Sequence, residues 1–179
     1  MFYVSEIQTE APDHFQTQLQ KQVYETLATL HIPFSRVDTD EAITMEDCVA
    51  IDKKLNMNMV KTLFLCNRQQ TNFYLFITVG NKPFRSKDFS SALGISRVSF
   101  APVEQLESML GTKIGATTIF SSLLDTENKI QIVFDKDVLS EEWYGCSDGT
   151  TTGYMKIRTD DIYQTFLPFT QHTPVVIEV

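Results

Sequence analysis

This sequence has three polar features that a purely structural domain would not need. Lys61 follows Val60 at the start of an apolar run, GATT (115–118) sets two threonines beside a glycine, and CSDGTTTG (146–153) repeats that composition. An ammonium group at the start of a buried strand can hold an anion or polarise a carbonyl. Loops rich in glycine and threonine can direct several N–H groups toward one oxyanion. The alternative is that Lys61 extends to solvent and both loops are ordinary turns.

The cysteines and histidines are weaker candidates for chemistry. Cys48, Cys66 and Cys146 are odd in number and far apart, which argues against a disulfide framework or zinc ribbon and suits a reducing cytoplasm. Cys66 ends an apolar run, as a buried thiol would, whereas Cys146 borders a polar loop and is the candidate nucleophile. The histidines are isolated, and we expect surface positions for His14, His31 and His172.

Length and composition exclude several classes of protein. The 179 residues, 42% hydrophobic and 21% charged, are typical of a single globular domain, which we place at 1–179. No apolar run approaches the roughly 20 residues that span a bilayer, and the first residues do not resemble a signal peptide. We therefore expect a cytoplasmic protein without membrane contact. The glycine-rich nucleotide loops, HExxH and GxSxG are absent, so neither a cofactor nor a metal is expected.

The charge is unevenly distributed along the chain. The net charge is −8, yet residues 51–113 hold nine basic and four acidic residues. A basic segment in an acidic chain can contact the phosphates of an RNA, although solvated surface lysines explain it as well. The candidate RNA-contacting residues are Lys53, Lys54 and Lys87.

Periodicity predicts the elements that position these features. An apolar stripe from Phe15 to Leu30 predicts a helix capped by Asp13, and Thr44 with Asp47 resembles a capping box for a second helix. The runs 60–66 and 73–79 predict a hairpin of central strands. Further helices are expected at 86–94, 102–111 and 159–167 (ended by Pro168), and further strands at 34–37, 97–100, 130–135, 143–146, 154–157 and 173–179. This irregular mixture favours an α+β domain over a doubly wound sheet.

Five segments in order resemble the YbaK/ProX-like editing domains, relatives of the prolyl-tRNA synthetase editing domain, and most of all the alanyl-tRNA(Pro) deacylase branch. They are VKTLFL (60–65), SRVSFAPVEQLESMLG (96–111), GATTIFSSLL (115–124), IQIVFDKDVL (130–139) and CSDGTTTGYMKI (146–157). The resemblance spans roughly residues 20–179. It implies a mixed, mostly antiparallel, partly barrel-like sheet flanked by helices. It also implies metal-free hydrolysis of the ester of a mischarged tRNA, with that tRNA and a prolyl-tRNA synthetase as partners.

The resemblance further implies roles for single residues. Lys61 matches a key active-site lysine near the acceptor end, and we expect it to share one cleft with both loops. The residues that match the amino-acid pocket are Thr62, Gly115, Ala116, Thr117, Thr118, Ile119, Cys146, Ser147, Thr150 and Thr151. Thr62 replaces a typical Asn, Ile119 a loop Pro, and Gly145-Cys146 or Cys146-Ser147 a His-Pro pair. These departures motivate one alternative, a catalytically inactive tRNA- or ligand-binding module. A Cys146-dependent acyl hydrolase is a second.

Overall fold

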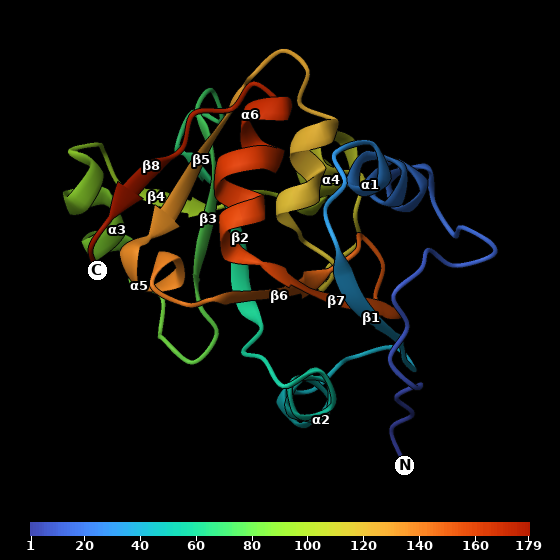
Figure 1. Ribbon diagram of the computed structural model, residues 1–179. Coiled ribbons are helices and arrows are strands. Elements are labelled where there is room, and N and C mark those ends of the chain that lie inside the picture. Colours follow the sequence, from blue (N-terminus) through green and yellow to red (C-terminus); the bar gives the residue numbers. More distant parts are fainter.

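The computed structural model describes residues 1–179 as two sheets surrounded by helices (Figure 1). The five-stranded sheet has the order β4 (Val98–Phe100), β2 (Val60–Asn67), β3 (Phe73–Val79), β5 (Ile130–Asp135), β8 (Val175–Ile177). The three-stranded sheet has the order β1 (Phe34–Asp38), β7 (Gly153–Arg158), β6 (Trp143–Ser147). All pairs are antiparallel except β3–β5 and β5–β8. A parallel bridge between Met59 and Gly145 joins the sheets, so the predicted mixed, mostly antiparallel fold is confirmed.

The helices agree with the sequence patterns in most places. They are α1 (Gln18–Thr29), α2 (Met45–Leu55), α3 (Ser86–Leu93), α4 (Val103–Leu110), the 3₁₀ helix η1 (Ile119–Leu123), α5 (Lys136–Leu139), the π-helix η2 (Asp161–Phe166) and α6 (Leu167–Phe169). The capping box of Thr44 and Asp47 is present at α2. The cap of α1 is Thr17, not Asp13. None of these helices has the length and hydropathy of a membrane-spanning segment.

The last helical region does not end before Pro168 as predicted. Pro168 lies in the first turn of α6, which continues directly from η2. The prediction treated Pro168 as a stop, whereas the helical region continues through Pro168 to Phe169.

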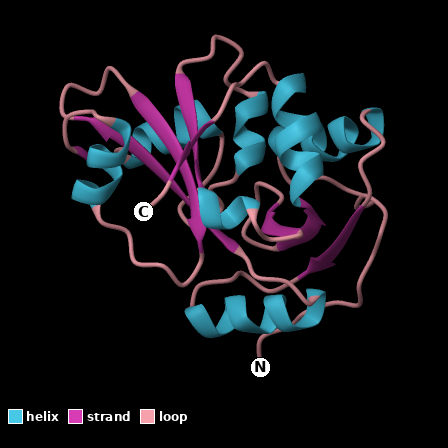
Figure 2. Cartoon of the chain, turned by 60° about the vertical axis from the view of Figure 1, so that its left-hand side comes forward, coloured by secondary structure: helices cyan, strands magenta, loops and turns pink.

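The five-stranded sheet is covered on both faces, as its apolar strands predict. A cluster of 22 buried residues fills the space between this sheet, the three-stranded sheet, α1, η1 and η2, and it includes Phe64. A second cluster of 6 buried residues lies under α3 on the opposite face and includes Leu65. Successive residues of β2 therefore enter different cores, which is the period of two of a strand. Figure 2 shows helices on either side of the strands.

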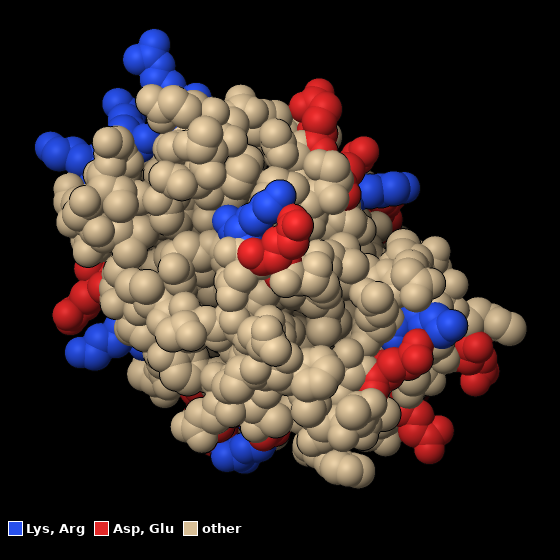
Figure 3. All heavy atoms as spheres, turned by 90° about the horizontal axis from the view of Figure 1, so that it is seen from above, with Lys and Arg blue, Asp and Glu red and all other residues tan.

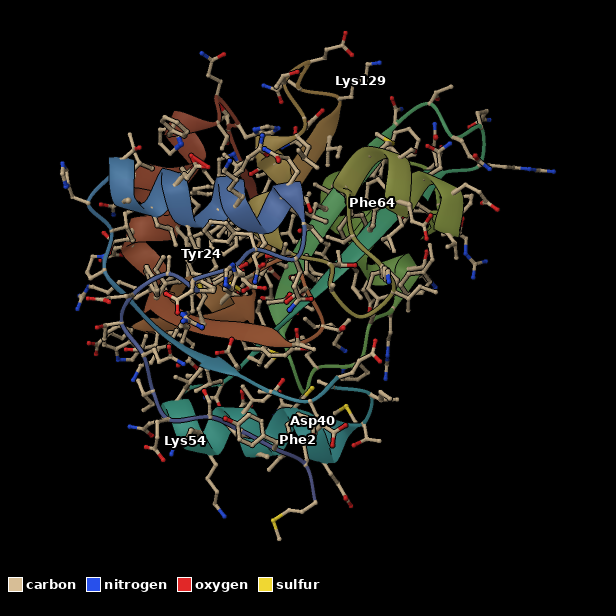
Figure 4. All side chains as sticks on the ribbon, turned by 90° about the vertical axis from the view of Figure 1, so that its right-hand side faces the viewer. Phe2, Tyr24, Asp40, Lys54, Phe64 and Lys129 are labelled. Atoms are coloured by element: carbon tan, nitrogen blue, oxygen red, sulfur yellow. The ribbon has the colours of Figure 1, made fainter.

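Helix α2 stands apart from the other helices, at the lower end of the molecule in Figures 1 and 2. It packs Ile51 and Leu55 against Val37 and Tyr154 of the three-stranded sheet. Figure 4 shows Phe2 lying against this helix, so the first residues of the chain help to hold it. The end of α2 is tied to the residue before β2, because the Met59 N–H donates to Asp52 Oδ1 at 3.0 Å.

Replacing Asp52 by asparagine is expected to stabilise the fold at neutral pH by about 1 kcal/mol. This value is smaller than the shift of the carboxyl pKa alone would give, because the side chain is partly exposed to solvent. Partial burial raises the pKa of this carboxyl from 3.8 to about 6. Because the folded state binds this proton more tightly than the unfolded chain, the free energy of unfolding falls as the pH rises from about 4 to about 6. Asparagine keeps an oxygen for the Met59 N–H. Urea unfolding from about pH 4 to about pH 7.5 should show a flatter profile for the variant; parallel profiles would contradict the assignment.

One histidine is not at the surface, so that expectation is wrong for His172. Its side chain is buried, and Nε2 lies 2.9 Å from Asp125 Oδ2. Asp125 also accepts the N–H groups of Lys129 and Ile130, at 2.9 and 2.8 Å. The pair fastens the turn before β5 to the end of α6. His14 and His31 are exposed, as predicted.

Candidate functional site

A cleft of about 170 Å³ opens where the start of β2, the 115–117 loop and the end of β6 meet. Five of its eight lining residues were predicted from the sequence: Thr62, Gly115, Thr117, Cys146 and Ser147. Met59, Val60 and Tyr154 complete the lining and were not predicted. Three segments that are far apart in the chain thus form one cleft. Its lining includes both hydroxyl-bearing and apolar side chains.

The rest of the 115–119 segment supports the cleft from below. Ala116 and Ile119 are buried, and Ile119 belongs to the main core. The Thr118 hydroxyl accepts the Phe120 N–H at the start of η1 and donates to the Ser147 carbonyl at 2.8 Å. This second bond fixes the two predicted loops to each other, so Thr118 positions the cleft although it does not line it.

Backbone donors remain free along the 115–118 loop. The Ala116 N–H donates to the Lys113 carbonyl at 3.1 Å, while the N–H groups of Gly115, Thr117 and Thr118 have no partner within the protein. Gly115 has φ +91°, a conformation that favours glycine. Unpaired N–H groups beside a cleft can hydrogen-bond a carbonyl oxygen or an oxyanion. The loop therefore has the donors that acyl-group chemistry requires.

Asp148 holds the second loop in place from inside. Its carboxylate accepts from Gln20 Nε2 at 2.9 Å, from the Tyr24 hydroxyl at 2.8 Å, and from the N–H and hydroxyl of Thr150 at 3.1 and 2.7 Å. Burial raises the pKa of Asp148, while these hydrogen bonds oppose that shift. Figure 4 shows Tyr24 below α1, on the side of β6 and β7. The 148–153 turn is thus tied to α1.

Two predicted pocket residues belong to this support rather than to the lining. Thr150 is buried and bonded to Asp148, and the Thr151 hydroxyl donates to Glu41 Oε1 at 3.2 Å. Gln20, Tyr24 and Asp148 were missed in the sequence. The one available signal was the Asp-Gly pair at 148–149, which is typical of a turn whose Asp side chain bonds nearby backbone.

Lys61 does not share the cleft with the two loops, contrary to the expectation. It alternates with Thr62 along β2, so its side chain leaves the opposite face of the sheet, where it is paired with Thr78. Its ammonium donates to the Lys82 carbonyl at 2.5 Å. The lysine is half-buried beside the cleft and connects β2 to the turn after β3.

The three lysines expected to contact RNA do not form one surface. Lys53 and Lys54 are in the last turn of α2, and Lys54 Nζ lies 3.5 Å from Glu6. Lys87 is on α3, which covers the other sheet. Figures 1 and 4 place α2, with Lys54 at its end, below the rest of the molecule, whereas α3 lies at the left of Figure 1.

The thiol of Cys146 is not arranged as a nucleophile. Its side chain is buried, and burial raises the pKa of the thiol far above its usual value. A reactive cysteine needs a lowered pKa and access to solvent. Cys66 is buried as predicted, and Cys48 is half-buried. The acyl hydrolase dependent on Cys146 therefore loses its physical basis.

Iodoacetamide is expected to leave Cys146 unmodified in the native protein at about pH 8, because the reagent attacks the thiolate and this thiol stays protonated. Mass spectrometry of the treated protein should locate any adduct on Cys48, the most accessible of the three. Unfolding in urea should then expose all three thiols as an internal control. An adduct on native Cys146 would contradict the burial and restore the nucleophile hypothesis.

Known proteins resemble this chain in sequence. The profile of the aminoacyl-tRNA editing domain matches residues 39–165. The zebrafish (Danio rerio) prolyl-tRNA synthetase associated domain-containing protein 1 is 27% identical over 161 residues, which is 89% of this chain and 86% of the relative. The prolyl-tRNA editing protein ProX of Acetoanaerobium sticklandii is 27% identical over 113 residues, which is 63% of this chain and 69% of the relative.

Solved structures share the architecture. The crystal structure of a candidate trans-editing enzyme for prolyl-tRNA synthetase superposes with a TM-score of 0.63 at 15% identity, covering 92% of this chain and 99% of that one. At this identity the likeness shows a shared fold. The sequence profile extends over most of the chain, and the chain belongs to the aminoacyl-tRNA editing domain family.

Proposed function

We propose that this protein is a trans-editing aminoacyl-tRNA deacylase that hydrolyses the ester of mischarged tRNA, with alanyl-tRNA(Pro) or another small aminoacyl ester as substrate. The observation that carries the proposal is the meeting of Thr62, the free N–H groups of the 115–118 loop and the Cys146–Ser147 segment at one cleft. Family membership supports the reaction class, and ProX supports the prolyl system. The protein would act in the cytoplasm, with a prolyl-tRNA synthetase as a further partner.

The reaction needs positioning more than a strong nucleophile, because an aminoacyl ester is already reactive. Water adds to the ester carbonyl carbon, and the N–H groups of Gly115 and Thr117, which line the cleft, hydrogen-bond the resulting oxyanion. The bond from carbon to the ribose oxygen then breaks, and that oxygen takes a proton to restore the terminal hydroxyl. The neighbouring ribose hydroxyl assists the attacking water, so no side-chain base is required.

Selectivity would be steric. The cleft holds about 170 Å³, and the side chains of Met59, Val60 and Tyr154 form its apolar wall. Such a site admits an alanyl group, whereas a larger cognate side chain would meet this wall. Thr62, in place of the family's usual Asn, offers the cleft one hydroxyl instead of an amide with separate donor and acceptor groups.

Lys61 would act on the phosphate next to the terminal nucleoside. Its position outside the cleft lining supports the phosphate rather than the ester carbonyl as its partner. A phosphate oxygen is a stronger acceptor for an ammonium than the Lys82 carbonyl that it contacts here. The incoming acceptor end would replace that carbonyl.

A panel of mischarged tRNAs tests the proposal. Alanyl-, seryl-, cysteinyl- and prolyl-tRNA(Pro) are incubated with the protein, and loss of the ester is followed over time. We expect alanyl-tRNA(Pro) to be hydrolysed and prolyl-tRNA(Pro) to be spared. Hydrolysis of none of them, with tRNA binding retained, would contradict the deacylase. That outcome would favour the inactive binding module suggested by the departures at Thr62, Ile119 and Cys146.

A further inference from the structure

A second hollow, of about 230 Å³, lies on the other face of the five-stranded sheet. It is formed by the end of β3, the 82–85 turn, the first turn of α3 and the last residue of the chain. One wall consists of phenyl rings: the centroids of Phe76 and Phe89 are 4.9 Å apart, and Phe84 lies 6.1 Å from each of them. Phe84 is half-buried, and Phe100 beside it is 61% exposed. Because Phe76 and Phe89 are buried, Phe84 is the ring of this wall that offers its surface to a planar ring.

The charged side chains that line the hollow are those of Lys82, Arg85 and Asp88, and Arg85 is the one cation among them that no carboxylate pairs with. Lys82 is neutralised by Asp135 and Asp137, at 2.7 and 2.8 Å. Arg85, by contrast, is exposed and has no acidic partner within 4.0 Å; Lys87 and Arg97 are also exposed and unpaired. Figure 3, which shows the face seen from above, has Lys and Arg side chains gathered at its upper left and an acidic side chain at its left edge.

Arg85 also precedes a helix without a side-chain cap. It is the N-cap residue of α3, and no side chain bonds the first N–H groups of that helix. A free guanidinium beside uncapped N–H groups attracts an anion such as phosphate. Asp88 lines the same hollow and would repel a phosphate placed on it, but its carboxylate can accept from the exocyclic amino group of a base.

The hollow and the cleft lie back to back at the same end of the sheet. Lys61 pairs with Thr78, which lines the hollow, and the next residue along β2, Thr62, lines the cleft. The ammonium of Lys61 bonds the Lys82 carbonyl in the turn that borders the hollow. A strand of RNA that leaves the cleft past Lys61 would meet the 82–85 turn, which carries Arg85.

We propose that this hollow is a nucleotide subsite for single-stranded RNA, in which a base stacks on Phe84 and its phosphate binds Arg85. The inference rests on the proposed function: the strand is the unpaired 3′ end of the tRNA, upstream of the aminoacylated nucleoside. An unpaired cationic side chain beside an accessible aromatic ring is a combination that proteins use to bind single-stranded nucleic acid without reading its sequence. The subsite would add affinity for the tRNA without contacting the ester.

The first experiment compares two substrates, alanyl-tRNA(Pro) and alanyl-adenosine, which lacks the upstream nucleotides. Arg85→Ala and Phe84→Leu are expected to raise KM for the tRNA about tenfold with kcat unchanged, and to leave hydrolysis of alanyl-adenosine unaltered. The matched control is Arg68→Ala, which removes the same charge from an unpaired arginine in the β2–β3 turn, at the far end of these strands. Equal effects of Arg85→Ala and Arg68→Ala on KM would overturn the subsite.

The second experiment measures binding without catalysis, which separates failure of the subsite from failure of the proposed function. Fluorescence anisotropy follows a labelled RNA tetranucleotide, ACCA, at about 50 mM and about 200 mM salt. Weaker binding to the Arg85→Ala and Phe84→Leu proteins, but not to the Arg68→Ala protein, supports the subsite even if no ester is hydrolysed. Unchanged binding overturns it, as does equally tight binding of an acidic peptide of the same net charge.

Discussion

Replacing Lys61 by alanine is expected to slow deacylation of alanyl-tRNA(Pro) by about 100-fold, the loss that a misplacement of about 1 Å at the reacting centre can cause. The ammonium would hold the phosphate that leads into the cleft, and without it the ester would be poorly aligned with the N–H groups of the 115–118 loop. The side chain is half-buried with a single hydrogen bond, to the Lys82 carbonyl, so the variant should remain folded. Single-turnover deacylation and thermal unfolding measure the two effects.

Two further variants give this expectation its controls. Lys61→Arg keeps the charge on a longer, planar group and should retain part of the activity. Lys21→Ala removes an exposed lysine from α1 that has no acidic partner, and should behave as the wild type. Turnover by Lys61→Ala at the wild-type rate would remove the lysine from the site and leave it a structural link between β2 and the 82–85 turn.

Local signals in the sequence predicted most of the elements. The capping box at Thr44 and Asp47 and the left-handed glycines Gly94 and Gly111 mark helix ends through contacts within a few residues. The β2 and β3 strands are apolar along most of their length, which indicates burial on both faces, and a core cluster covers each face. Such features depend on residues that are close together in the sequence, so they can be predicted from the sequence.

Long-range contacts decided what the sequence could not predict. The face of β2 that carries Lys61 follows from pairing with β3, and a shift of one residue would have placed the lysine in the cleft. His172 is buried because Asp125, 47 residues away, accepts from it. The polar loop at 147–153 gave no sign that Asp148 is buried, because its partners Gln20 and Tyr24 lie in α1. Charge and polarity in a sequence show what is available for bonding, not where the partner is.

The three departures from the family pattern lie in two different places, the lining of the cleft and the main core. Thr62 and Cys146 line the cleft, so these two substitutions change its shape and its hydrogen-bonding groups. Ile119 is fully buried in the main core, where a β-branched side chain contributes packing under the loop. The substrate range of this chain should therefore depend on Thr62 and the 146–147 segment more than on Ile119.

Replacing Asp148 by alanine is expected to lower the free energy of unfolding by about 3–5 kcal/mol and to abolish deacylation. The carboxylate is the buried acceptor for Gln20, Tyr24 and two groups of Thr150, and alanine would leave these donors without partners in the interior. The 148–153 turn would separate from α1, and the adjoining Ser147 would leave the cleft wall. Urea unfolding and the alanyl-tRNA(Pro) assay measure the two losses.

The matched control is Asp160→Ala, which removes an exposed carboxylate that caps nothing and should change stability by less than about 0.5 kcal/mol. The Asp148→Ala substitution introduces no steric clash, because alanine is smaller than aspartate. The packing is nevertheless close, since a Cβ built on Gly153 would meet the Asp148 carboxylate. If Asp148→Ala unfolds at the same urea concentration as the wild type, the buried network contributes nothing to stability. If it also deacylates normally, the turn does not position the cleft.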